Sequence, residues 1–77
     1  MDRYTLTEEG RARSRRRIIS ESAETARMEG NEMLDFLYEH GTATVEELME
    51  YTGMSRYHVM DKILIYVNHG IIEKLLS

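Results

Sequence analysis

The 77-residue sequence contains no cysteine, no proline and no tryptophan. The lack of cysteine excludes a disulfide framework and any thiolate-bound metal site. No apolar run of about 18 residues is present, so the sequence predicts no membrane-spanning helix, and nothing in it matches a signal peptide. These absences predict a soluble protein of the cytoplasm.

Patterns that carry catalysis are also missing from the sequence. A chain of this length forms one small domain, whose core is too small to hold a buried catalytic cleft as well. There is no glycine-rich phosphate loop, nucleophile elbow or pair of catalytic carboxylates. The three histidines, His40, His58 and His69, lack the spacing of metal ligands. We therefore expect no enzyme activity, no metal and no cofactor.

Residues 42–72 carry start, turn and stop signals at the spacing of a helix-turn-helix. Thr44 and Glu47 form the T-x-x-E pattern of a capping box, which predicts a helix over residues 45–51. Gly53 can adopt the positive φ that ends this helix in a tight turn.

A second helix is expected directly after the turn. Ser55 is its predicted N-cap, and the helix should cover residues 56–68 and end before Gly70. Residues 71–76 then form a short β-prone run. The helical spacing predicts an inward side made of Val59, Ile63, Tyr66 and Val67.

These features together resemble the winged-helix family of transcription regulators: a leucine in the first helix, Gly-x-Ser at the turn, valine four residues before isoleucine, then Gly-Ile-Ile. The resemblance covers roughly residues 31–76. It implies a mainly α fold, a winged helix-turn-helix with an extra N-terminal helix and a minimal β-ribbon. It also implies binding of double-stranded DNA, although winged helices serve as protein-interaction modules too.

The N-terminus contains a second family-like pattern. Residues 3–11 resemble the Y-x-L-T-x-x-G run that forms the second wing strand in winged-helix regulators of the MarR and PadR kinds. Here the run precedes the domain, and the chain ends directly after the expected first wing strand. Pairing of residues 4–6 with residues 72–75, within one chain or across a dimer, would cover an exposed strand edge. A frayed N-terminus is the alternative.

The charge distribution divides the chain. Residues 1–30 carry 7 Lys and Arg against 6 Asp and Glu, or +1, and residues 31–77 carry 3 against 8, or -5. Because phosphate neutralisation supplies most nucleic-acid affinity, the acidic helix-turn-helix should bind DNA weakly by itself. Two interpretations of the arginine run stay open, phosphate contact and a solubilising charged segment. Its members are Arg11, Arg13, Arg15, Arg16 and Arg17.

An apolar seam at alternating spacings of four and three runs along the N-terminal half and indicates a homodimer. Its predicted interface residues are Ile19, Ala23, Ala26, Met33 and Leu37. Either one long helix covers residues 8–39, or Gly30 breaks it and Asn31 caps a new helix over residues 32–39. We divide the chain into residues 1–30, for dimerisation or phosphate contact, and residues 31–77, the winged helix-turn-helix.

In helix-turn-helix geometry, the N-terminal half of the second helix enters the major groove. The candidate DNA contacts are therefore Ser55, Arg56, Tyr57, His58 and Lys62, together with the five arginines. Asp61 fits this surface poorly, because a carboxylate repels phosphate. The sequence thus predicts a homodimeric, sequence-specific DNA-binding transcription regulator. The alternative is a winged-helix module for protein contacts in a transcription or replication assembly.

Overall fold

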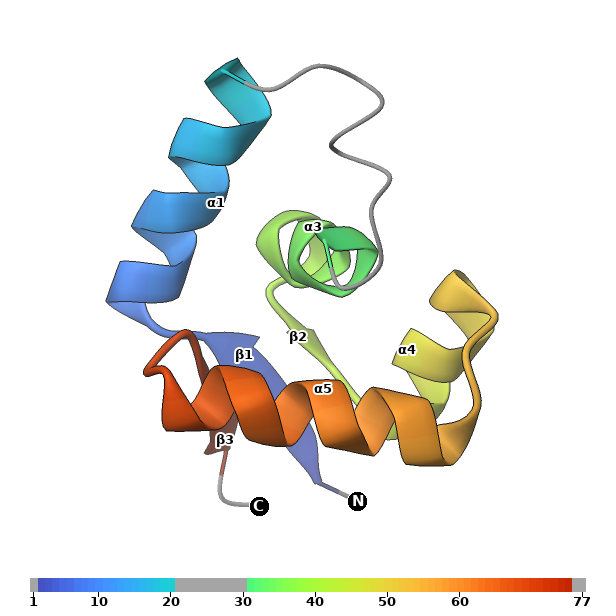
Figure 1. Cartoon of the computed structure of the whole chain (residues 1–77). Coiled ribbons are helices and arrows are strands. Elements are labelled where there is room, and N and C mark those ends of the chain that lie inside the picture. Colours follow the sequence, from blue (N-terminus) through green and yellow to red (C-terminus); the bar gives the residue numbers. More distant parts are fainter. Residues whose placement is uncertain (1, 21–30, 76–77) are drawn as a thin grey trace.

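The computed structural model describes residues 2–20 and 31–75, and these ranges contain four helices and three strands (Figure 1). In chain order they are β1 (Arg3–Leu6), α1 (Glu8–Ser20), α3 (Asn31–His40), β2 (Thr42–Ala43), α4 (Val45–Thr52), α5 (Arg56–Asn68) and β3 (Ile72–Leu75). The described chain is mainly helical with a small sheet, as the sequence predicts. None of these helices is long and apolar enough to cross a membrane.

The N-terminal strand is the centre of the sheet, whose order is β2-β1-β3. Both pairings are antiparallel: Tyr4 faces Ala43 of β2, and Leu6 faces Ile72 of β3. Pairing of residues 4–6 with β3 inside one chain is therefore confirmed, and residues 3–6 form a strand instead of a frayed segment. Tyr4 and Leu6 point the same way along the strand and are both buried.

The turn from α4 to α5 has the predicted caps. The Thr44 hydroxyl accepts a hydrogen bond from the Glu47 backbone N–H at 3.1 Å, and the Thr44 backbone N–H donates to the Glu47 carboxylate at 3.0 Å. Gly53 ends α4 with φ +77, and the Ser55 hydroxyl caps α5 by accepting from the His58 backbone N–H at 3.2 Å. The predicted bounds of α5 are confirmed.

The hydrophobic core lies where α3, α4 and α5 meet the sheet. Its most deeply buried apolar side chains come from each of these elements: Met33, Leu37, Ala43, Leu48, Val59 and Ile72. Of the predicted inward residues of α5, Val59 and Ile63 are buried and Tyr66 packs against the core. The assignment of Val67 was wrong, since one helical step of about 100° turns it away from Tyr66 and leaves it 38% exposed.

A close junction joins α1 to the end of α5. The Thr7 backbone N–H donates to the Ile71 carbonyl at 2.9 Å, and the Thr7 hydroxyl donates to the Gly70 carbonyl at 2.6 Å. The same hydroxyl accepts from the Gly10 backbone N–H at 3.0 Å and so caps α1. The step from β1 into α1 is thereby fixed against the residues that open β3.

The chain between residues 8 and 39 does not form one helix. α1 and α3 are separate elements that pack against each other, which one straight helix cannot do (Figure 1). The single-helix interpretation was therefore wrong, and the separate helix predicted over residues 32–39 is confirmed, although it covers Asn31–His40 and includes Asn31 rather than being capped by it. The strand β2 was not predicted at all.

Candidate functional site

An apolar stripe runs along an exposed flank of α5, next to the side that the core buries. We call it the outer stripe, and its side chains are large and exposed: Tyr57 83%, Met60 44%, Leu64 60% and Val67 38%. Ile65 is also 41% exposed but lies about 100° from Leu64, off the stripe. Val59 and Ile63 are buried beside this stripe, so the apolar surface of α5 is wider than the part that the core covers.

The residues predicted to read DNA lie at the start of α5, and several are used inside the chain. Ser55 is the N-cap, and Arg56 forms an ion pair with Glu46 of α4 at 3.3 Å between Nη2 and Oε1. Tyr57 is highly exposed, His58 is exposed and Lys62 is half-buried. An acidic side chain of α4 thus already neutralises the arginine at the helix start.

A shallow groove of about 360 Å³ separates the start of α5 from α4. It is lined by Met49, Met54 and the ion pair of Arg56 and Glu46, with Glu50 at its side. Two methionines and two glutamates in its lining suit a mixed apolar and basic segment of a protein better than a phosphate group.

The arginine run of α1 divides between two roles. The Arg11 guanidinium lies 5.6 Å from the centre of the Tyr38 ring, and Arg15 Nε donates to the Tyr38 hydroxyl at 3.2 Å. This hydrogen bond raises the pKa of Arg15 above its ordinary value. Arg11 and Arg15 therefore tie α1 to α3 through one tyrosine.

Arg13 and Arg16 lie three residues apart in α1, and so on one side of the helix. Arg13 and Arg16 are exposed, and the side chain of Arg17 lies outside the described residues. Ser14, between them in sequence, is 2% exposed and faces inward. All four described arginine side chains of the run are exposed, and two of them, Arg11 and Arg15, are also in contact with Tyr38.

The described side chains of the predicted dimer seam are buried by other parts of the same chain. Met33 and Leu37 are fully buried in the core, so they offer no surface to a second copy. Their assignment to a dimer interface is therefore corrected. Ala23 and Ala26 lie outside the described residues, as does the side chain of Ile19.

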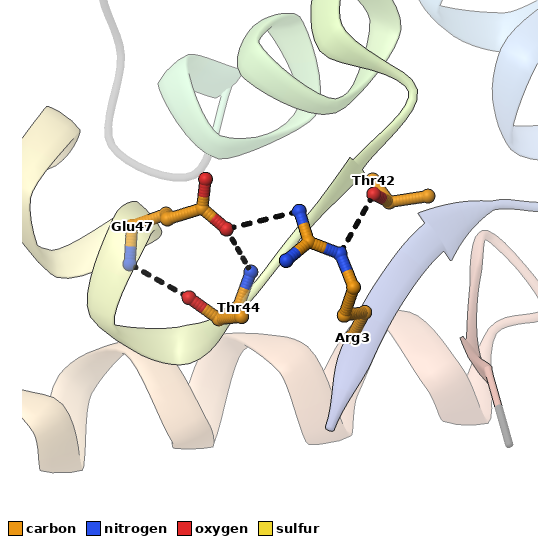
Figure 2. Close-up of polar contacts among 4 residues, drawn as sticks. All are labelled: Arg3, Thr42, Thr44 and Glu47. Carbon is orange, nitrogen blue, oxygen red and sulfur yellow. Dashed lines mark hydrogen bonds and ion pairs between the residues drawn. The ribbon is translucent and has the colours of Figure 1, made fainter. Parts of the chain in front are cut away.

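A polar cluster that the sequence reasoning missed joins β1 to α4 (Figure 2). Figure 2 shows Arg3 between two partners: its Nη2 lies 3.1 Å from Glu47 Oε1, and its Nε donates to the Thr42 hydroxyl at 3.0 Å. The Thr44 backbone N–H lowers the pKa of Glu47 below its ordinary 4.5, and the Arg3 charge lowers it further. Arg3 thus extends the capping box to the central strand, a structural role.

The described residues hold no group of three His, Cys, Asp or Glu side chains able to bind a metal ion. Comparison with models of known protein families finds no match, and comparisons with curated proteins and with solved structures find none either.

Proposed function

We propose that this chain is a winged helix-turn-helix domain whose second wing strand comes from its N-terminus. Three features support this proposal: the tight turn between α4 and α5, the strand β3 directly after α5, and the central position of β1 in the sheet. β1 lies antiparallel to β3, with Arg3 opposite Leu75, as the second strand of a wing hairpin does.

The function that the geometry supports best is protein docking through α5. The outer stripe carries this proposal, because it presents four large apolar side chains to solvent on one helical line. The adjoining surface is acidic, with Glu46 and Glu50 on α4 and Asp61 on α5. Such a surface repels DNA phosphates and suits an apolar helix of a protein partner.

A photocrosslinking amino acid placed at Leu64 tests this docking role in the cells that make the protein. The same amino acid at Glu73, exposed on β3, is the control. We expect position 64 to crosslink to a polypeptide and position 73 to give far less product. Crosslinking of position 64 to DNA, or to nothing, would contradict docking through α5.

Sequence-specific DNA binding as a homodimeric transcription regulator is the second candidate. The exposed Arg13 favours it, since this side chain can contact a phosphate while Arg11 and Arg15 keep their contacts with Tyr38. In this candidate Tyr57 and His58 would face the bases, and Arg56 would have to leave Glu46.

A further inference from the structure

The outer stripe has the spacing of a coiled-coil seam. Tyr57, Met60, Leu64 and Val67 follow one another at three, four and three residues, the alternation with which two parallel helices interdigitate. In that arrangement Tyr57 and Leu64 are a positions, and Met60 and Val67 are d positions. We infer that the outer stripe of α5 pairs in parallel with the outer stripe of a second copy of this chain. The inference rests on the proposed docking role of α5.

Charge complementarity selects a second copy as the occupant. Arg56 directly precedes the first a position, and Asp61 directly follows the first d position, so the two flank the stripe on opposite sides. Arg56 is thus a g position and Asp61 is the e position five residues later. In a parallel pair, a g position of one helix faces this e position of the other helix across the interface. Arg56 of each copy therefore meets Asp61 of the other, and the two-fold contact contains this attractive pair twice.

An antiparallel pair would lose this complementarity. Tyr57 would then face Val67 of the second copy, and Asp61 would come near the other Asp61. The two Tyr57 residues would also lie about 15 Å apart along the axis, ten residues at a rise of about 1.5 Å. The charge pattern of α5 thus favours the parallel arrangement.

Arg56 is available for a contact between copies. Its present partner is Glu46, and both side chains are more than half exposed, 59% and 51%. An exposed ion pair of this kind contributes little to folding, so exchanging Glu46 for Asp61 of a second copy costs little.

Sedimentation of the full chain over a concentration series tests the pairing. We expect a reversible dimer that Leu64→Asp reduces to monomer, because an a-position charge would be buried against its own copy. Ile65→Asp is the matched control, an exposed apolar position on the same helix but off the stripe, and should leave the dimer intact. Circular dichroism checks that both variants fold.

Charge reversal and a single cysteine test the parallel register. Asp61→Arg should weaken the dimer about tenfold, because it removes both attractive pairs and adds two repulsive ones, and adding Arg56→Asp should restore it. Since the chain has no cysteine, Tyr57→Cys provides one unique thiol. Two such thiols, one from each copy, can form a disulfide if the helices pair in parallel and are too far apart if they pair antiparallel. Ile65→Cys should not crosslink.

Three results would overturn the inference. A monomer at every concentration would exclude the second copy, and a crosslink from position 64 to a different polypeptide would then leave the docking role intact. If Leu64→Asp leaves the dimer unaffected, the dimer interface lies elsewhere on the chain. A dimer in which Tyr57→Cys fails to crosslink and the double charge reversal fails to restore pairing would not be parallel.

Discussion

Gly10 of α1 lies directly against the backbone of Ile71, at the corner where α5 leads into β3. A Cβ built on Gly10 would stand only 2.1 Å from the Ile71 carbonyl oxygen. That oxygen also accepts the Thr7 backbone N–H at 2.9 Å, so it cannot move away without breaking the junction. The glycine of the Y-x-L-T-x-x-G run is therefore explained by close packing of α1 on the ribbon.

Gly10→Ala should destabilise the protein by about 1–3 kcal/mol, the cost of forcing extra volume into a packed contact. The sign of the change in unfolding free energy is informative, because in a helix without such a contact alanine is more stable than glycine by roughly 1 kcal/mol. Urea denaturation measures the change. Arg13→Ala, exposed in the same helix, should stay within about 0.5 kcal/mol of the parent. A more stable Gly10→Ala variant would contradict the close packing of α1 on Ile71.

The central position of β1 makes the first residues essential to the fold. Leu6→Ala should cost about 2–5 kcal/mol of unfolding free energy, because Leu6 is 5% exposed and its removal leaves a cavity. Leu64→Ala, at 60% exposure, is the same chemical change on the surface and should cost far less in the monomer. Equal costs for the two variants would mean that β1 does not belong to the core sheet.

The Glu47 carboxylate should make stability depend on pH in the acid range. Its folded-state pKa lies below 4.5, so the negative form is favoured by folding. The contribution is complete above the ordinary pKa and is lost as pH falls through the lowered value. Thermal unfolding of Glu47→Gln should therefore show a flatter loss of stability on acidification than the parent. The same acid dependence in parent and variant would assign the effect to other carboxylates.

Local signals explain why much of the fold could be predicted from the sequence. The capping box of Thr44 and Glu47, the positive φ of Gly53 and the Ser55 cap are satisfied within a few residues of chain. These caps depend only on residues that are close together in the sequence, so the bounds of α5 could be predicted from the sequence. The pairing of β1 with β3 was predictable because each strand leaves an exposed edge that needs a partner strand.

Features that depend on distant contacts could not be read in this way. β2 has two residues, and its strand conformation comes from Tyr4 pairing opposite Ala43, with the Thr5 hydroxyl donating to the Gly41 carbonyl at 2.6 Å. The sequence of an apolar helical stripe likewise does not show whether the core of the same chain or another molecule covers it. Met33 and Leu37 were assigned to a dimer and lie in the core, and Val67 was assigned to the core and is exposed.

Duplex DNA binding across a salt series separates the two candidate functions. With α5 as a docking helix, we expect weak binding that depends on the α1 arginines. Arg13→Gln combined with Arg16→Gln should then weaken binding to every duplex and reduce the salt slope by about 0.9 for each phosphate that is no longer neutralised. Arg56→Ala should change DNA binding little, because the surface around this side chain carries Glu46, Glu50 and Asp61, which repel phosphates. A preferred duplex whose affinity falls by about 1–3 kcal/mol in Arg56→Ala, with random duplexes unaffected, would instead show base reading by α5 and support the DNA regulator.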